Sequence, residues 1–98
     1  MKRDKFYYLD GSILNYYDDT KKLHRLDGPA IEYASGSKWW YVKGKRHRLD
    51  GPAVEFSSGS KRWWVNGKYL TEEEFETHPK RYDYLASLAI EEILNERK

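Results

Sequence analysis

The chain has 98 residues, of which 39% are hydrophobic and 35% charged, and its mean hydropathy is −0.99. This length suits a single domain, and no apolar run approaches the roughly 20 residues that a membrane-spanning helix needs. Because there is no cysteine, disulfides, thiolate zinc sites and a cysteine nucleophile are excluded. The start, MKRDKFYYLDG, lacks the apolar stretch of a secretory signal, so we expect a cytoplasmic protein.

The net charge of +2 is unevenly distributed along the chain. Residues 1–70 hold 14 Lys and Arg against 8 Asp and Glu, whereas residues 71–98 hold 4 against 8. The first region is therefore basic and the tail acidic. An excess of six positive charges is too small to indicate nucleic-acid binding by itself, and a solvated basic surface is the simpler interpretation.

Most of the basic region is a repeat with a period of 23 residues. The two full copies are HRLDGPAIEYASGSKWWYVKGK from His24 and HRLDGPAVEFSSGSKRWWVNGK from His47. We align an earlier partial copy, FYYLDGS at residues 6–12, with WWYVKGK at residues 39–45, which leaves ten extra residues within SILNYYDDTKKL. The chain is thus predicted to contain about two and a half repeats.

Each copy has the pattern of β-hairpins. AIEY and AVEF alternate apolar and polar residues with the period of two that a strand requires. ASGS and SSGS place a glycine at the third position of a short hairpin loop, and the tryptophan-rich strands that follow end in Lys-Gly or Asn-Gly turns. The segment KRHRL can return as a short strand before Asp-Gly-Pro turns the chain again. The repeats therefore predict a meander of strands joined by tight turns.

The tail is predicted to be helical. Thr71 and Glu74 have the spacing of a capping box, which predicts a short helix that ends before His78-Pro79. A longer helix is expected over residues 80–96, because apolar residues recur there at helical spacing. The members of this stripe are Tyr82, Leu85, Ala86, Ala89, Ile90 and Ile93. Leu88 and Leu94 widen it, so the helix is either buried on two sides or paired with another chain.

These elements define an α+β fold: an antiparallel β-meander sheet capped by a C-terminal helix pair. We interpret residues 1–98 as one domain, with the repeat sheet over residues 6–70 and the helical cap over residues 71–98. Two and a half repeats cannot bury their own apolar face, and the longer helix is the obvious cover.

Strand alternation separates the tandem aromatic residues onto two faces. We assign the first face to the core, with the members Tyr7, Leu9, Ile31, Tyr33, Trp40, Val42, Val54, Phe56, Trp63 and Val65. The second face is predicted to carry Phe6, Tyr8, Trp39, Tyr41 and Trp64, with Arg62 in the place of Trp39. One helix covers only one side of a sheet, so the second face is predicted to be an exposed contact surface. The alternative is that the tail or SILNYYDDTKK folds over this face, or that the sheet curls.

The repeated His-Arg pairs are the other candidate residues. His24, Arg25, His47 and Arg48 could line a groove for phosphate or carboxylate. In the alternative interpretation, each histidine holds the Asp-Gly-Pro turn and each arginine pairs with a nearby carboxylate. Two histidines without a third ligand do not make a zinc site, and no catalytic constellation is present. We therefore expect no enzyme activity, no cofactor and no metal.

The repeated HRLDGPA, WW and NGK segments resemble MORN-type repeats, in a divergent form common in small phage and viral proteins. The resemblance covers residues 24–68 and the partial copy at 6–12. It implies a single-layer meander of hairpins that serves as a scaffold or a binding surface. Some MORN-like proteins have been linked to lipids. This sequence departs from their usual Tyr-x-Gly-x-Trp signature, so lipid binding does not carry over.

Three functions are compatible with these features. The first is a non-enzymatic protein-binding module, such as a phage-encoded inhibitor of a host protein or defence system, that uses the aromatic and basic face. The second is a nucleic-acid or nucleotide-binding protein, in which the aromatic residues stack on bases and the cations hold phosphates. The third is a structural or self-assembling protein, because free sheet edges and the helix stripe both favour pairing, as in a homodimer. None of the three involves a membrane.

Overall fold

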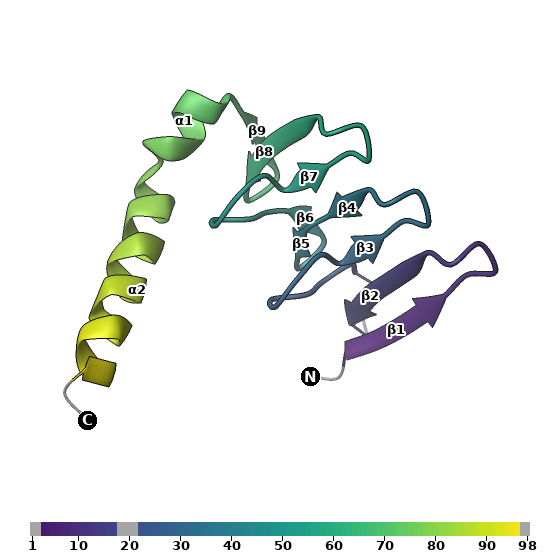
Figure 1. Ribbon diagram of the computed structural model, residues 1–98, viewed down its shortest axis with the longest axis horizontal. Helices are drawn as coiled ribbons and strands as arrows, with labels where there is room; N and C mark the ends of the chain where they lie inside the picture. The colour runs from purple at the N-terminus through teal and green to yellow at the C-terminus, as the bar shows by residue number, and fades with distance from the viewer. Residues whose placement is uncertain (1–2, 18–21, 97–98) are drawn as a thin grey trace.

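Figure 1 shows the computed structural model, which describes residues 3–17 and 22–96 and leaves the side chains of residues 3, 4, 6, 16 and 17 undescribed. The strands are β1 (Arg3–Tyr7), β2 (Ile13–Tyr17), β3 (Ile31–Glu32), β4 (Lys38–Trp39), β5 (Tyr41–Val42), β6 (Lys45–Arg46), β7 (Val54–Glu55), β8 (Lys61–Val65) and β9 (Lys68–Leu70). The helices are α1 (Glu72–Glu76) and α2 (Pro79–Glu96).

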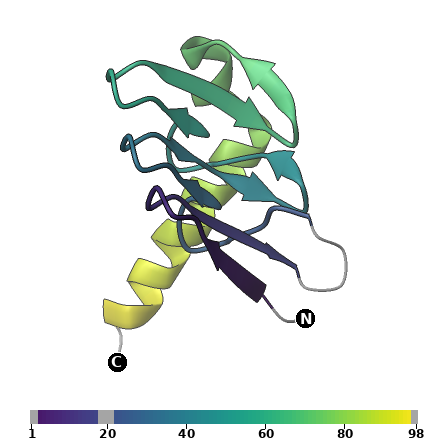
Figure 2. The same cartoon turned by 90° about the vertical axis from the view of Figure 1, so that its right-hand side faces the viewer.

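The strands form the predicted antiparallel meander. Pairing runs in the order β1-β2-β3-β4-β7-β8-β9, and β5 and β6 form a second, two-stranded sheet. Backbone hydrogen bonds also join the two full copies, because the Trp40 N–H donates to the Ala53 carbonyl and the His47 N–H donates to the Trp40 carbonyl. The copies consequently stack side by side along the molecule, as Figure 2 shows. The α+β fold class is confirmed.

Three equivalent loops close the β1-β2, β3-β4 and β7-β8 hairpins. In the second loop the Tyr33 N–H donates to the Ser37 carbonyl, and the intervening Gly36 has a φ of 100°. A residue with a side chain rarely adopts this left-handed conformation, which is why a glycine occupies the third loop position. Serine hydroxyls then link the loops, since Ser12 accepts the Ala34 N–H and Ser37 accepts the Ser57 N–H.

The alignment predicted for the partial copy is wrong. Tyr8 and Ser12 make the same loop hydrogen bond as Tyr33 and Ser37, so Asp10-Gly11 matches Ser35-Gly36 and not the Lys43-Gly44 turn. Asn15 takes the place of Trp40, because their N–H groups donate to the equivalent carbonyls of Ala30 and Ala53. The N-terminal segment is therefore a divergent hairpin of the same kind, and a shared Asp-Gly dipeptide was a misleading guide to its register.

Helix α1 closes the last repeat. Thr71 accepts the Glu74 N–H while the Glu74 carboxylate accepts the Thr71 N–H, which is the predicted capping box. These hydrogen bonds hold the pKa of Glu74 below its usual range. Phe75, the buried residue of this helix, packs with Val65 and Leu70 in a cluster that Leu49 and Trp63 border. The cap of the sheet is thus one short helix.

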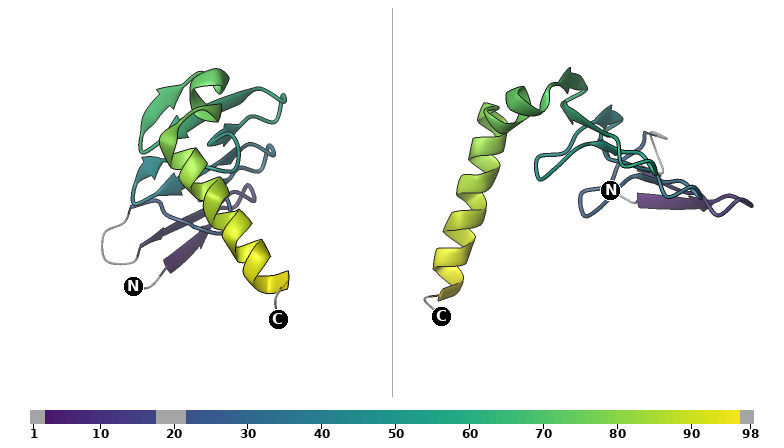
Figure 3. Two further views of the ribbon diagram at one scale, coloured as in Figure 1. Left: turned by 90° about the vertical axis from the view of Figure 1, so that its left-hand side faces the viewer. Right: turned by 45° about the horizontal axis from the view of Figure 1, so that its top comes forward.

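Helix α2 does not cover the sheet, which corrects the arrangement predicted for the first face. None of its 18 residues is buried, and the views in Figures 1 and 3 show it alongside the repeats and splayed away from them. The radius of gyration is 15.1 Å, against about 13 Å for an ordinary domain of 100 residues. The extra length reflects this projecting helix.

Cross-strand register also corrects the face assigned to the residues of β3 and β7. Ile31 lies opposite Trp39, and Trp39 lies opposite Val54. Directly opposite residues of an antiparallel pair share a face, so both aliphatic residues belong with Trp39. A three-residue loop enforces this register, whereas the predicted faces require a loop one residue longer or shorter. Ile31 and Val54 are buried in the positions that this pairing gives them.

Candidate functional site: an aromatic, arginine-rich sheet face

One side of the sheet gathers aromatic and arginine side chains from both full copies. We call it the aromatic face and define it by Tyr33, Trp39, Tyr41, Arg46, Phe56, Arg62, Trp64 and Tyr69. Register and ring contacts join these residues across β4 to β9. The predicted separation of Trp39, Tyr41 and Trp64 from Trp40 and Trp63 is thus confirmed, while Tyr33 and Phe56 move to the aromatic face.

Trp39 is the centre of an edge-to-face cluster. Its ring lies 5.9 Å from that of Tyr33 and 6.2 Å from that of Phe56, with interplanar angles of 76° and 85°. Such edge-to-face pairs are favourable because the positive ring edge meets the negative ring face. Arg62 extends the cluster, with its guanidinium 5.6 Å from the Phe56 ring. Trp39 is consequently held in one orientation by neighbours on both sides.

Arg46 lies between Trp39 and Trp64, the two tryptophans of the aromatic face. Its guanidinium carbon is 4.8 Å from the ring of Trp39 and 4.8 Å from the ring of Trp64, and its Nε donates to the Tyr41 hydroxyl at 3.1 Å. Arginine is well suited to this place because its planar guanidinium stacks on aromatic rings. The two copies are thereby joined into one surface by a cation.

The aromatic face carries positive charge without a carboxylate of its own. No Asp or Glu of the described residues forms an ion pair with Arg46 or Arg62. The carboxylates of β3 and β7, on Glu32 and Glu55, alternate onto the other side of the sheet. Charge on this face is therefore left for solvent or for a partner.

Exposure of the face is partial. Trp39, Tyr41 and Trp64 are half-buried, whereas Tyr33, Phe56 and Tyr69 are 40%, 36% and 55% exposed. No described helix covers these residues, and SILNYYDDTKK contributes strand β2 to the sheet over its described part. Both covers considered from the sequence are thus absent from the described chain.

The N-terminal residues predicted for the contact surface lie at its border. Tyr8 is 56% exposed at the first hairpin loop, in the place equivalent to Tyr33. Phe6 lies opposite Leu14 in the β1-β2 pair, but its side chain is outside the described structure. Neither residue takes the place equivalent to Trp39 or Tyr41 that the sequence alignment gave it.

Sequence reasoning missed Arg46, Tyr69, Tyr33 and Phe56 as members of the face. The signal for the first two was present in the turns. Lys43-Gly44 and Asn66-Gly67 have positive φ at both positions, as two-residue hairpin turns require. Counting outward from such turns pairs Tyr41 with Arg46 and Trp64 with Tyr69.

The repeated histidines hold these same turns. His24 Nδ1 accepts the Lys43 N–H at 2.9 Å, and His47 Nδ1 accepts the Asn66 N–H at 3.0 Å. Each histidine at the start of a copy thus satisfies the backbone of the turn that ends the copy. Of the two roles considered from the sequence, the turn-stabilising role has this direct support, although the turn is Lys-Gly or Asn-Gly instead of Asp-Gly-Pro.

The repeated arginines are fully engaged within the chain. Arg48 donates to the Asp50 carboxylate, the Pro52 carbonyl and the Glu55 carboxylate at 2.8, 3.1 and 3.1 Å, and it stacks 3.8 Å from the ring of Trp40. Arg25 repeats the bonds with Asp27, Pro29 and Glu32.

Glycine follows the aspartate in each copy for a packing reason. A Cβ on Gly51 would lie 2.9 Å from the Arg48 guanidinium carbon, and one on Gly28 would lie 2.8 Å from that of Arg25. The HRLDGPA segment therefore encodes an arginine clamp on its own turn.

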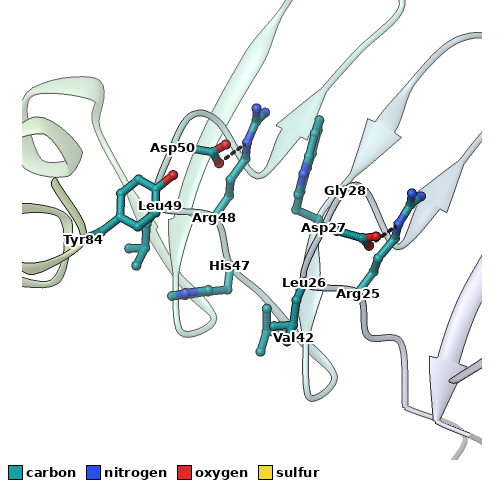
Figure 4. Close-up of a pocket in the computed structure, with 11 residues that line it drawn as sticks. Arg25, Leu26, Asp27, Gly28, Val42, His47, Arg48, Leu49, Asp50 and Tyr84 are labelled. Atoms are coloured by element: carbon teal, nitrogen blue, oxygen red, sulfur yellow. Dashed lines mark hydrogen bonds and ion pairs between the residues drawn. The ribbon is translucent and has the colours of Figure 1, made fainter. Parts of the chain in front are cut away.

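Figure 4 shows a cleft between the two Asp-Gly-Pro loops and α2. Arg25 and Arg48 line it with their paired aspartates, and Tyr84 of α2 lies beside Leu49. Burial, and to a lesser extent the charge of nearby Lys80, lower the pKa of His47, which favours the neutral ring that its turn needs. Of the four residues predicted to line a groove, Arg25, His47 and Arg48 line this cleft and His24 does not. Both arginines are bound to the chain's own carboxylates.

The described residues contain no cluster of three or more His, Asp and Glu side chains able to hold a metal. Among them, no helix has the length and apolarity that a membrane crossing demands. Comparison with protein-family models, curated proteins and solved structures finds no match. The resemblance to MORN repeats therefore stays a prediction from the sequence.

Proposed function

We propose that the chain is a non-enzymatic protein-binding module whose aromatic face docks on an acidic protein surface. The observation that carries this proposal is Arg46, which lies between two tryptophans without a carboxylate partner among the described residues. Tryptophan, tyrosine and arginine are the residues most enriched at interface hot spots. A host protein as the partner, and inhibition as the outcome, stay predictions from the repeat resemblance.

The packing of the face favours a protein over a nucleic acid. Single-stranded nucleic acids stack their bases on open aromatic rings. Here the guanidinium of Arg46 already stacks on both Trp39 and Trp64, and the ring edges of Tyr33 and Phe56 pack against Trp39. A pre-packed surface of this kind suits a partner that contributes carboxylates and apolar side chains across a broad contact.

Two neighbouring cations of β8 provide a matched test. Arg62 belongs to the aromatic face, whereas Lys61 lies opposite Glu55 and alternates onto the other side. The probe is a soluble copolymer of glutamate and tyrosine, and its affinity for each variant is measured by isothermal titration calorimetry. We expect Arg62→Ala and Arg46→Met to weaken binding at least about fivefold, and Lys61→Ala to leave it within twofold.

Three outcomes would overturn the proposal. The first is equal binding by the Arg62→Ala and Lys61→Ala variants, which would place the contact elsewhere. The second is tight binding of oligothymidylate that weakens steeply between low and moderate salt, since phosphate contacts have that dependence. The third is absence of any binding to the acidic copolymer, which would remove the charge argument.

A further inference from the structure

The cleft of Figure 4 is the first copy's counterpart of the cluster that Phe75 closes in the second copy. Through the period of 23 residues, four members of that cluster have counterparts in the first copy: Leu49, Trp63, Val65 and Leu70 correspond to Leu26, Trp40, Val42 and His47. All four counterparts line the cleft. The repeat therefore builds the same pocket twice.

Phe75 covers the pocket of the second copy alone. Val65 is 3% exposed there, whereas Val42 is half-buried, and Leu49 is half-buried, whereas Leu26 is 79% exposed. Phe75 comes from α1, but the first copy is followed by the HRLDGPA segment of the second copy and not by a helix. This difference leaves a cleft of about 580 Å³ in the first copy, which is within the size range of ligand sites.

The cap of the second copy indicates which chemistry fits such a pocket. Phe75 packs in the cluster, and the guanidinium carbon of Arg81 lies 4.7 Å from its ring. Arg81 also donates to the Leu49 carbonyl, whose counterpart in the first copy is the Leu26 carbonyl. A buried aromatic ring removes a large apolar area from water, and a guanidinium over its face adds a cation–π contact. A phenylalanine and an arginine together thus suit this pocket.

The charges along the cleft also favour a basic partner. Its cations are Arg25 and Arg48, and each of them binds two carboxylates. These four carboxylates belong to Asp27, Glu32, Asp50 and Glu55. The Asp27 and Asp50 side chains are 68% and 55% exposed, against 21% and 18% for the arginines that bind them. The cleft therefore presents an excess of negative charge to solvent.

The adjoining cavity does not change this balance. Lys80 and Asp83 of α2 line it together with His47, whose lowered pKa favours the neutral ring. One cation and one carboxylate cancel, so the negative excess at the cleft remains.

We propose that the cleft binds a segment of a partner protein that presents a phenylalanine and an arginine. The phenylalanine ring packs on Leu26, Trp40 and Val42, in the place that Phe75 takes in the second copy, and the arginine lies near the exposed aspartates. The aromatic face is positively charged and suits an acidic partner, so this second site does not rest on the proposed function.

A short peptide tests the site. The probe is the acetylated and amidated tripeptide Phe-Gly-Arg, added to the full chain while the indole N–H signals are followed by ¹⁵N NMR. The Trp40 signal should shift and saturate, and the signals of Trp39 and Trp64 should stay in place. Ala-Gly-Arg lacks the ring and Phe-Gly-Glu reverses the charge, and each should bind at least about fivefold more weakly.

Two exposed leucines provide matched variants. Leu26→Lys places a cation in the cleft and should weaken binding of Phe-Gly-Arg at least about fivefold. Leu9→Lys makes the same change at the tip of the first hairpin loop and should leave the affinity within about twofold. Figure 1 shows that the hairpin loops lie at the opposite end of the strands from the Asp-Gly-Pro loops. Both side chains are exposed, so both variants should fold.

Three results would overturn the site. They are an unchanged Trp40 signal at millimolar Phe-Gly-Arg, equal affinities of the Leu26→Lys and Leu9→Lys variants, and binding of Phe-Gly-Glu as tight as that of Phe-Gly-Arg. Arg62→Ala changes the aromatic face and should leave the tripeptide affinity within about twofold. Failure of the cleft can therefore be distinguished from failure of the aromatic face.

Discussion

Two arginines at the junction of the two full copies, Arg46 and Arg48, lie two residues apart and have opposite roles. Arg48 has two carboxylates and a carbonyl as partners and covers Trp40. Arg46 has two indole rings and a hydroxyl, and no described carboxylate. The difference shows that the role of a basic residue in this chain follows from whether its charge is already balanced. We call the side of the sheet with Trp40 and Trp63 the closed side, because the ion pairs of Arg48 cover it. The aromatic face is the open side, because its arginines have no described carboxylate partner.

The largest expected effect is at the end of the closed side. Phe75→Ala should lower the free energy of unfolding by about 3–5 kcal/mol, because it empties the centre of the cluster with Val65 and Leu70. Urea denaturation followed by circular dichroism measures the change. Leu94→Ala is the control, since Leu94 is 56% exposed, and it should cost less than about 0.5 kcal/mol. Equal effects would mean that α1 does not cap the sheet.

The next prediction compares the two arginines directly. Arg48→Met keeps an apolar stem over Trp40 but leaves the Asp50 and Glu55 carboxylates without their cation, so we expect a loss of about 2 kcal/mol. Arg46→Met retains contact with the indoles and should cost under about 1 kcal/mol. Both are measured by the same urea titration. A larger loss from Arg46→Met would reverse the assignment of the two sides.

A smaller effect is expected at the glycine of the clamp. Gly51→Ala introduces a Cβ that displaces the Arg48 guanidinium, with an expected loss of about 1 kcal/mol. The same substitution in the Arg48→Met background should cost less, because the displaced bonds are already gone. A double-mutant cycle measures this coupling. Simple additivity would show that the glycine serves the turn and not the arginine.

The smallest prediction concerns pH. The pKa of His47 is lowered in the folded chain, so the unfolded chain binds the proton more readily and stability falls as the pH drops below about 6.5. Thermal unfolding between about pH 7 and about pH 5 should show a decline that is reduced in His47→Asn, which keeps an acceptor for the Asn66 N–H. An identical decline in both proteins would assign the pH dependence to other groups.

The sequence was a good guide to local structure and a poorer guide to how local elements combine. Gly36 at the third loop position predicted the hairpin, and the Asn66-Gly67 turn was also predicted. The face predicted for Ile31 was nevertheless wrong. The three-residue loop pairs Ile31 with Trp39, and the prediction did not use this loop length to set the register of the two strands. Periodicity shows which residues of one strand share a face, whereas the turns decide which faces of two strands coincide.

Helix α2 illustrates a second limit of prediction from the sequence. Its apolar stripe was read from the sequence, and the stripe alone cannot show whether it meets the sheet or another chain. The bonds of Arg81 and the place of Tyr84 fix the side that faces the repeats. These contacts join segments about 32 residues apart, a kind of information that spacing along one helix does not contain.

The most direct test of the open and closed sides uses the four tryptophans as reporters. Indole N–H signals of Trp39, Trp40, Trp63 and Trp64 can be followed by ¹⁵N NMR while the glutamate–tyrosine copolymer is added. The signals of Trp39 and Trp64 should shift together, and those of Trp40 and Trp63 should stay in place, because they lie on the closed side. Shifts confined to Trp40 and Trp63 would contradict the account.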